Sequence, residues 1–323
     1  MGYIRFDAVS LTFPRASRPA VNQCSVEIQE GQLVVLLGPS GCGKTTLLKM
    51  VNRLYEPTSG EILLNETPIQ RIPATKLRQQ IGYVIQQSGL FPHMTVAQNV
   101  GVVPKLLGWS KQKIAARVDE LLELIGLPPQ DYRDRHPAQL SGGQQQRIGL
   151  ARALAADPKV MLMDEPFGAL DAITRTALQN EILRLQRQLK KTILFVSHDV
   201  EEALRLADKI LVMRAGQIVQ YDSPFQILTN PANDFVRDLL GTDDMVRQLG
   251  ILRVDTAMTG VAEAAHKSHT NNGHPTIDRQ ENLRQALSLI LKTGSEELVV
   301  VDNGTAVGLL TLDHIRHSAQ PQT

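Results

Sequence analysis

The chain has 323 residues, enough for about two domains, and its 42% of hydrophobic and 21% of charged residues are ordinary for a globular protein with a full core. Lysine and arginine together number 34 against 33 aspartate and glutamate, so the chain lacks the basic excess that is typical of nucleic-acid binders. No apolar run approaches the ~18 residues of a bilayer span, and the chain start has no apolar signal core. The two cysteines indicate no disulfide framework. We therefore expect a protein of the reducing cytoplasm.

Strand-like and helix-like segments alternate up to about residue 235. Short apolar runs bounded by turn or charged residues predict buried strands at residues 32–38, 159–165, 191–197 and 208–214. Helical periodicity between them predicts helices over residues 113–126 and 174–191. This alternation predicts an α/β fold with a mostly parallel sheet and helices on its faces.

The pattern changes over residues 241–275, which are polar and rich in turn-forming residues and therefore predict a linker or loop. A helix is expected over residues 281–292, where one face carries an apolar stripe of Leu283, Ala286, Leu287, Ile290 and Leu291. Two short apolar runs on either side of Asn303-Gly304 predict a β-hairpin, and a short helix is expected to close the chain.

A phosphate-binding loop is predicted directly after the first of the buried strands. The stretch GPSGCGKT matches the pattern G-x-x-x-x-G-K-[ST] between a strand and a helix, which is the context that the motif requires. Its glycines let backbone N–H groups wrap phosphates, Lys44 should reach the β- and γ-phosphates, and the Thr45 hydroxyl should bind Mg²⁺. The strand, the helix and the Lys-Thr pair together argue against a chance glycine-rich turn. The residues of this loop are Gly38, Pro39, Ser40, Gly41, Cys42, Gly43, Lys44 and Thr45.

Polar residues follow three other strand-like segments. Asp164 and Glu165 end an apolar run, where one carboxylate can complete a Mg²⁺ shell and the other can activate water. The alternative is a pair of acids that make ordinary surface contacts. Gln86 and His198 also follow apolar runs, and they indicate function only as part of this larger pattern.

The stretch SGGQQQR, residues 141–147, predicts a second anion-binding helix start because it stands just before an apolar-periodic run. The alternative is a plain serine cap with a flexible turn. One chain with two such sites needs an explanation, since a single nucleotide occupies one phosphate loop.

These motifs together resemble the nucleotide-binding subunit of ATP-binding cassette (ABC) transporters over about residues 3–240. SGGQQ resembles the family signature, LMDEP the strand carboxylates, GALD the D-loop and SHD the switch histidine. Gln86 falls at the Q-loop position, and Phe13 falls at the position of the aromatic residue that stacks on adenine. The resemblance implies a P-loop NTPase fold with a mixed-sheet core and a helical subdomain over residues 1–240.

The resemblance also implies ATP and Mg²⁺ as ligands and assigns roles to individual residues. Glu165 would be the general base, and His198 would bind the γ-phosphate. The metal would be held by Thr45, Asp164 and Gln86, and Gln86 would also contact the attacking water. The implied nucleotide contacts are Phe13, the loop from Gly38 to Thr45, Thr46, Ser141, Gly142, Gly143, Gln144 and Asp171.

In the family two cassettes face each other head to tail, which accounts for two anion sites in one chain. Ser141 and the Gly143 N–H would touch the partner's ATP, and Asp171 would link the two sites across the dimer. The implied partners are therefore a second copy of the chain, the transmembrane subunits of a permease and, indirectly, a solute-binding protein, with no nucleic acid. The implied location is peripheral, on the cytoplasmic face of the cell (inner) membrane.

Longer stretches, such as LLKMVNRLYEPTSGEI and NPANDFVRDLLG, resemble the ATPases of osmoprotectant importers, which take up glycine betaine, choline, carnitine and related quaternary amines. Import of another small polar solute remains an alternative. A soluble ABC ATPase that acts on ribosomes or DNA is a further alternative, although such proteins usually carry two cassettes or a long coiled-coil insertion. A nucleotide-sensing module is the third.

The tail over residues 254–317 resembles one cystathionine-β-synthase (CBS) motif, a regulatory module, and so implies a small α+β region within residues 241–323. Regulatory units of this kind normally pair two motifs, and nucleotide-binding ones usually carry Asp three residues after a Thr in the last strand. Counted from Thr311 that residue is His314, which argues against nucleotide binding by the tail. We expect the apolar helix stripe to need a facing surface, supplied by a second tail or by the chain's own cassette.

Overall fold

The computed structural model of the chain describes residues 3–86, 89–168, 170–241, 249–250, 252–260, 275–302 and 304–318. It separates into two units, Met1–Tyr221 and Asp222–Thr323, and each is treated by itself. The expected boundary between a cassette and a regulatory region, at residue 240, stays a prediction. Within the described residues, no helix combines the length and the apolar character that a bilayer crossing requires.

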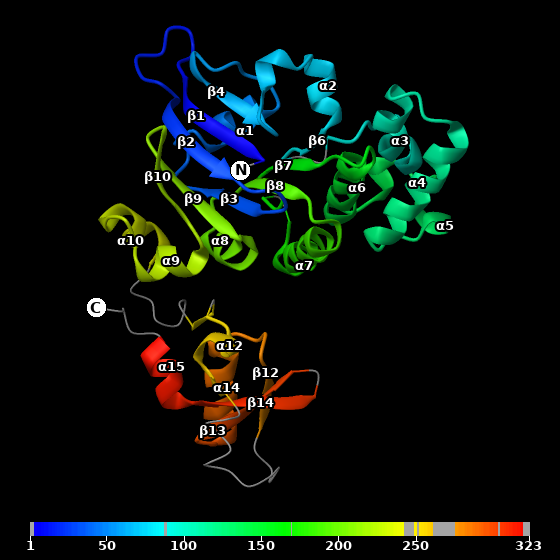
Figure 1. The fold of residues 1–323 in the computed structure, drawn as a ribbon. Coiled ribbons are helices and arrows are strands. Elements are labelled where there is room, and N and C mark those ends of the chain that lie inside the picture. The colour runs from blue at the N-terminus through cyan, green and yellow to red at the C-terminus, as the bar shows by residue number, and fades with distance from the viewer. Residues whose placement is uncertain are drawn as a thin grey trace. The chain divides into compact units, whose positions relative to one another are not determined.

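Two β-sheets form the body of the first unit (Figure 1). One is a four-stranded antiparallel sheet in the order β2-β1-β4-β5, with β1 Ile4–Leu11, β2 Val21–Ile28, β4 Ser59–Leu64 and β5 Thr67–Pro68. The other has six strands in the order β10-β9-β3-β8-β7-β6, with β3 Leu33–Leu37, β6 Ile81–Val84, β7 Val160–Asp164, β8 Thr192–Val196, β9 Lys209–Arg214 and β10 Gln217–Asp222. Strands β6, β7, β8, β3 and β9 run parallel, so the predicted parallel sheet and its strands are confirmed.

Helix α1, Lys44–Val51, lies in the hydrophobic core that the two sheets share. Leu47 and Leu48 of this helix pack in one cluster with Phe6 of β1 and Leu36 of β3. All five residues of β3 are buried because both faces of the strand are covered. The phosphate loop is therefore anchored between the most buried strand of the large sheet and the helix that fills the core.

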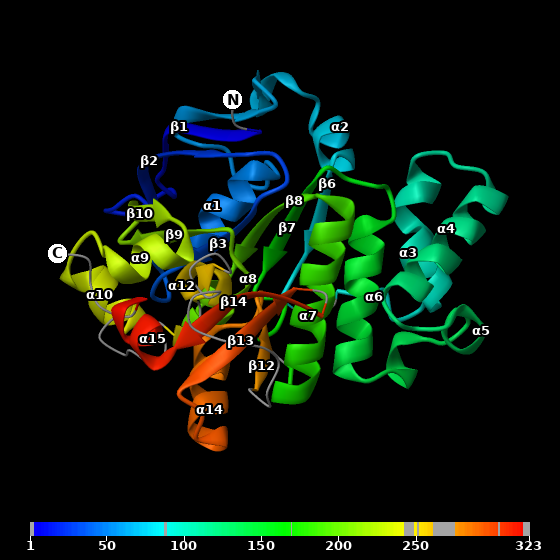
Figure 2. The ribbon, with the colours of Figure 1, turned by 60° about the horizontal axis from the view of Figure 1, so that its bottom comes forward.

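Helices α3 to α6 form a separate helical region beside the large sheet (Figure 1). Helices α6 and α7 lie side by side (Figure 2). The helices of this unit are α2 Ala74–Gln79, α3 Val96–Leu106, α4 Lys111–Leu124, α5 Pro129–Tyr132, α6 Gly142–Leu154, α7 Ala172–Leu189 and α8 Val200–Leu206, with short 3₁₀ turns at Ile69–Arg71 and Pro137–Gln139. The helices that the periodicity predicts over residues 113–126 and 174–191 are thus confirmed as α4 and α7.

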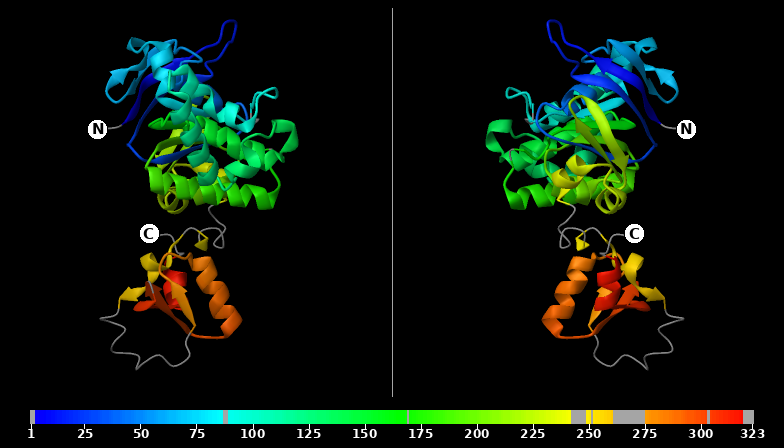
Figure 3. Two further views of the ribbon diagram at one scale, coloured as in Figure 1. Left: turned by 90° about the vertical axis from the view of Figure 1, so that its right-hand side faces the viewer. Right: turned by 90° about the vertical axis from the view of Figure 1, so that its left-hand side faces the viewer.

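The second unit contains a small sheet in the order β11-β14-β13-β12, with α14 packed against it (Figure 3). Its strands are β11 Thr259–Gly260, β12 Thr276–Asp278, β13 Glu297–Asp302 and β14 Thr305–Thr311, and its helices are α9 Pro224–Thr229, α10 Asp234–Leu240, α12 Val254–Ala257, α14 Leu283–Thr293 and α15 Leu312–Ser318. Strands β13 and β14 are antiparallel, which confirms the predicted hairpin, and α15 confirms the predicted closing helix.

The apolar stripe of α14 finds its facing surface inside this unit. Leu283 and Ile290 are buried in one cluster with Leu298 of β13 and Leu310 of β14. Leu291 alone points away from the cluster, with 73% of its surface exposed. The expectation that the stripe needs a second tail or the cassette is therefore wrong, because the unit's own sheet covers it.

Candidate active site

The phosphate loop follows β3 and leads into α1. Gly38, Gly41 and Gly43 have φ angles of 150°, 77° and 108°, which residues with a Cβ rarely adopt. A Cβ on Gly38 would overlap with the carbonyl oxygen of Met213, and one on Gly43 would overlap with that of Ala20. Glycine is thus required at both positions by the conformation and by the packing, and it leaves backbone N–H groups uncovered.

Lys44 is buried at the base of this loop, with 6% of its surface exposed. Its Nζ donates to the carbonyl oxygens of Gly38 at 2.7 Å and Pro39 at 3.0 Å. The ammonium group is therefore held against the loop's own backbone. Pro39 and Ser40 are exposed on the outer side, while Cys42 is a buried free thiol.

Oxygen atoms suited to a divalent cation meet next to the loop. The Thr45 hydroxyl donates to Asp164 Oδ1 at 2.8 Å, which joins the start of α1 to the end of β7. A hydroxyl and a carboxylate are ligands that Mg²⁺ prefers. Burial and the Asp164 carboxylate raise the pKa of Tyr83, on β6, to about 12, so this phenol stays protonated at neutral pH.

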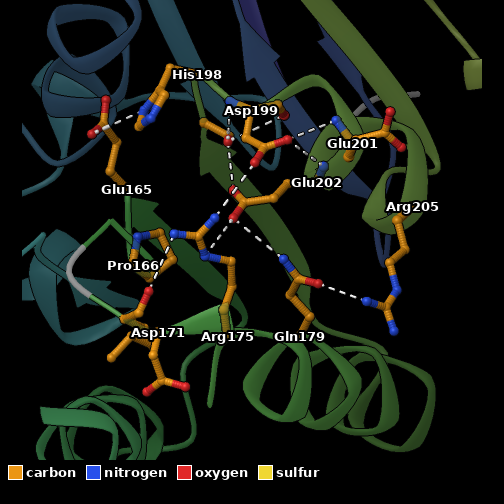
Figure 4. Close-up of polar contacts among 12 residues, drawn as sticks. Glu165, Pro166, Asp171, Arg175, Gln179, His198, Asp199, Glu201, Glu202 and Arg205 are labelled. Carbon is orange, nitrogen blue, oxygen red and sulfur yellow. Dashed lines mark hydrogen bonds and ion pairs between the residues drawn. The ribbon is translucent and has the colours of Figure 1, made fainter. Parts of the chain in front are cut away.

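Glu165 lies at the centre of the site, at the end of β7. Its φ of 45° is in the left-handed region, which is uncommon for a residue other than glycine and costs of order 1–3 kcal/mol. Gln86 Nε2 donates to Glu165 Oε2 at 3.1 Å. His198 Nδ1 lies 3.4 Å from the same oxygen, as Figure 4 shows. Because β6, β7 and β8 are neighbouring parallel strands, the three side chains that follow them converge on one edge of the sheet.

The signature stretch forms the start of α6. Ser141 Oγ accepts a hydrogen bond from the Gln144 N–H at 3.3 Å, and Gln144 Oε1 accepts one from the Ser141 N–H at 3.0 Å, so the two residues make a capping box. Ser141 and Gly142 are exposed, whereas Gly143 is buried against Thr174 of α7. Within the part of the chain that the structure describes, no side-chain hydrogen bond joins Ser141 or Gln144 to the phosphate loop.

Phe13 and Asp171 lie in loops outside the sheet edge. The Phe13 ring packs edge-on against Tyr55, with 5.2 Å between the ring centroids. Asp171 caps α7 by accepting hydrogen bonds from the N–H groups of Thr174 and Ile173, and these bonds lower the pKa of its carboxyl. The exposed Asp171 is therefore ionised at neutral pH.

Residues that the sequence did not single out surround the site. Buried Gln146 of α6 donates from Nε2 to the Pro166 carbonyl oxygen at 2.7 Å, which ties the signature helix to the turn after Glu165. Arg175 of α7 and buried Glu202 of α8 lie beside the turn that carries His198 (Figure 4). The contacts of Gln146 with Pro166 and of Arg175 with Glu202 join separate segments, so no local pattern could have found them.

The sequence is similar to those of known proteins. A family model described as ABC transporter matches residues 21–168. The osmoprotectant import ATP-binding protein OsmV of Salmonella typhimurium is 53% identical over 93% of this chain and 76% of the relative. The carnitine transport ATP-binding protein OpuCA of Listeria monocytogenes is 46% identical over 97% of the chain and 76% of the relative.

The chain belongs to the ABC transporter family. It groups with the ATP-binding subunits of osmoprotectant importers, including the glycine betaine uptake ATP-binding protein YehX of Escherichia coli, 48% identical over 93% of the chain and 94% of the relative. The predicted family, the cassette fold and the activity of a transporter ATPase that binds ATP are confirmed. The likeness of the tail to a CBS motif stays a prediction.

Solved structures agree with this fold. The cbiO1 protein of Clostridium perfringens, part of the cbiONQ complex, superposes with a TM-score of 0.67 at 26% identity and covers 77% of this chain and 94% of its own. The cassette MJ0796, solved as a dimer bound to ADP and Pi, has a TM-score of 0.62 at 30% identity and covers 68% of this chain and 98% of its own.

Proposed function

We propose that the chain hydrolyses ATP to power the import of quaternary-amine osmoprotectants, of the glycine betaine, choline and carnitine class, through a partner permease. The observation that carries this proposal is the extent of the similarity. The relatives OsmV, OpuCA and YehX align with 93–97% of the chain, beyond the cassette and into the second unit. The glycine betaine/carnitine transport ATP-binding protein GbuA of Listeria monocytogenes aligns with 68% of the chain. The spermidine/putrescine import protein PotA of Mesorhizobium japonicum is 48% identical, yet it aligns with 69% of the chain. Identity within the cassette alone therefore does not distinguish solutes.

Glu165 is the proposed general base. Its carboxylate takes a proton from the water that attacks the γ-phosphate, Gln86 orients that water, and His198 hydrogen-bonds the γ-phosphate. The contacts of 3.1 Å and 3.4 Å that join these side chains support the assignment, since hydrolysis is mainly positioning and charge stabilisation. The phosphate loop, from Gly38 to Thr46, would hold the phosphates, and Phe13 would stack on adenine.

The residues present fit a bound Mg²⁺. Thr45, Asp164 and Gln86 would hold the ion, and the hydrogen bond from Thr45 to Asp164 already places two of the three donors together. When bound, Mg²⁺ supplies positive charge to the phosphate oxygens. Lys44 would add the second positive charge once its ammonium turns from its own loop to the nucleotide.

A head-to-tail homodimer is the proposed working form. Ser141 and Gly142 stand exposed at a helix N-terminus that the capping box has already ordered, which supports contact with a nucleotide held by a second chain. Gly143, Gln144 and Asp171 would complete the contacts across the dimer. The similar cassette MJ0796, solved as a dimer, supports a dimeric form.

The permease would dock on the helical region. A groove of about 530 Å³ opens between α3 and α4, lined by apolar residues such as Met94, Val102 and Ile114 and by the cations Lys105 and Lys111. Leu106, the last residue of α3, has 79% of its surface exposed. Such a groove suits an amphipathic helix from a membrane subunit. Docking there would hold the chain at the cytoplasmic face of the membrane, with a solute-binding protein acting on the permease.

The test is uptake in cells or proteoliposomes that contain the chain and its permease. We expect ATP-dependent uptake of labelled glycine betaine, choline or carnitine, and none of spermidine. Glu165→Gln should abolish uptake while ATP still binds, since loss of a positioned base costs ~10²–10⁴ in rate. Uptake of polyamines alone would support the alternative solute, and ATP turnover with no uptake of any solute in the presence of the permease would support a soluble ATPase.

A further inference from the structure

The turn that carries His198 is held on both sides by polar contacts. The Asp199 N–H donates to Ser197 Oγ at 2.9 Å, and Ser197 Oγ donates to Glu202 Oε2 at 2.6 Å. Asp199 caps α8 by accepting hydrogen bonds from the N–H groups of Glu201 and Glu202 at 2.8 and 3.2 Å. Both sequence neighbours of His198 are therefore fixed to the first turn of α8.

Glu202 is the buried member of this group, with 7% of its surface exposed. Its Oε1 accepts a hydrogen bond from Gln179 Nε2 at 3.3 Å and lies 3.9 Å from Arg175 Nε. A buried carboxylate is costly unless it is paired and hydrogen-bonded. Arg175 supplies the cation that this carboxylate faces across the gap between α7 and α8 (Figure 4).

One guanidinium group contacts three residues in two separate segments, the D-loop and the start of α8. Arg175 Nη2 donates to the carbonyl oxygen of Leu170 in the D-loop at 3.3 Å, and Nη1 lies 3.7 Å from Asp199 Oδ2. Arg175 Nε is buried and has no hydrogen-bond partner among the described residues, so its nearest compensating charge is Glu202. The planar fork of arginine can serve partners in several directions at once, which a lysine ammonium cannot do in the same geometry.

We propose that Arg175 is a positioning residue that fixes the D-loop to the turn of His198. Through Leu170 it holds the backbone next to Asp171, and through Asp199 and Glu202 it holds both flanks of the histidine. A shift of the D-loop on contact with a second cassette is thereby passed to His198 and to Glu165, 3.4 Å from it. The inference rests on the proposed roles of His198 and Asp171.

The test compares Arg175→Ala and Arg175→Lys in the purified full-length chain, with Arg184→Ala as the control. Arg184 lies on the same helix and pairs with Glu181, away from the site. We expect Arg175→Ala to lower kcat about tenfold or more while the KM for ATP stays within about twofold, because misplaced catalytic groups affect the rate more than binding. Arg184→Ala should change neither constant.

Arg175→Lys separates positioning from buried-charge pairing. A lysine keeps the positive charge near Glu202 and should restore the melting temperature, but it lacks the fork and should leave kcat low. Wild-type kcat in Arg175→Lys would overturn the proposal. This variant also keeps the test valid if Arg175→Ala fails to fold.

A double mutant checks that Arg175 acts through Glu202. If it does, Arg175→Lys combined with Glu202→Gln should have a kcat within about twofold of the lower single mutant, because the two residues act as one unit. Losses that multiply would contradict the mechanism. Glu165→Gln, measured in parallel, tests the hydrolytic site itself, so a failure of the site and a failure of this inference give different results.

Discussion

At the scale of single residues, the turn of His198 depends on a side chain, Glu202, whose environment opposes its charge. Burial, together with the neighbouring Asp199 carboxylate, raises the pKa of its carboxyl. The hydrogen bond from Ser197 and the charges of Arg175 and His198 oppose that rise without cancelling it. The ionised form that Arg175 faces therefore exists at a cost to the folded state.

This cost predicts a pH dependence of stability. A raised carboxyl pKa means that the folded chain holds the proton more tightly than the unfolded chain. The stability that this proton contributes is fully present below the ordinary carboxyl pKa of about 4.3, and it is lost as pH rises through the pKa of the folded chain. Glu202→Gln does not titrate, so wild type should lose stability relative to this variant as pH rises from about 4 to neutrality. Urea unfolding of both proteins across that range measures the difference, and a constant difference would contradict the prediction.

At the scale of elements, sequence patterns correctly predicted the segments whose structure depends on residues close together in the chain. The phosphate loop, the buried strands β3, β7, β8 and β9, and the hairpin of β13 and β14 depend on residues close in sequence. The antiparallel sheet of β1, β2, β4 and β5 was not predicted, because β1 mixes buried and exposed residues without regular alternation and contains a register shift after Phe6.

The contacts between elements explain the rest of what sequence reasoning missed. The left-handed conformation of Glu165 and the reach of Arg175 to Leu170, Asp199 and Glu202 depend on how β7, α7 and α8 meet. The need for glycine at position 143 also depends on a contact between elements. The family resemblance assigns Gly143 to nucleotide contact, and the structure shows that packing also requires a glycine there. A Cβ at this position would overlap with Thr174 Cγ2, where α6 meets α7.

Gly143→Ala should therefore destabilise the chain although alanine favours helix. Overpacking costs about 1–3 kcal/mol and the helix preference returns about 1 kcal/mol, so we expect a net loss of up to about 2 kcal/mol. Gly142→Ala is the matched control for folding, because nothing lies near its added Cβ. Thr174→Ser removes the overlapping methyl group and keeps the hydroxyl, so it should restore stability to Gly143→Ala. Denaturant unfolding of wild type, Gly143→Ala, Gly142→Ala and the double mutant Gly143→Ala/Thr174→Ser measures these free energies of unfolding. An unchanged free energy of unfolding in Gly143→Ala would refute the packing explanation.

At the scale of the whole molecule, the proposed dimer shares each site between two chains. Ser141→Arg would put a bulky cation at the exposed start of α6 without touching the chain's own phosphate loop, whereas Lys44→Ala damages that loop. Each variant alone should lose turnover. In a mixture, one composite site carries both changes and the other carries neither, so some ATPase activity should return. No recovery at any mixing ratio would show that sites are not shared or that both are needed.

The second unit raises a different question, since its core is its own. The cluster that contains Leu283, Ile290, Leu298 and Leu310 closes without a second tail, so pairing of tails is not needed to cover α14. A chain cut after Gly241 would keep α10 whole, because Gly241 adopts the left-handed conformation that ends this helix. The cut therefore removes the region that resembles a CBS motif and leaves all residues of the first unit, Met1–Tyr221, in the chain.

Truncation after Gly241 should leave ATPase activity within about twofold of wild type, because the residues proposed to bind and hydrolyse ATP all lie in the first unit. If the tail couples transport to ionic strength through contacts between polar surfaces, salt should screen those contacts and the truncated chain should respond less to salt. ATPase and solute uptake, measured against salt in proteoliposomes with the permease, compare the two chains. An unchanged salt response would remove the regulatory role, and a loss of ATPase activity would show that the tail supports the fold.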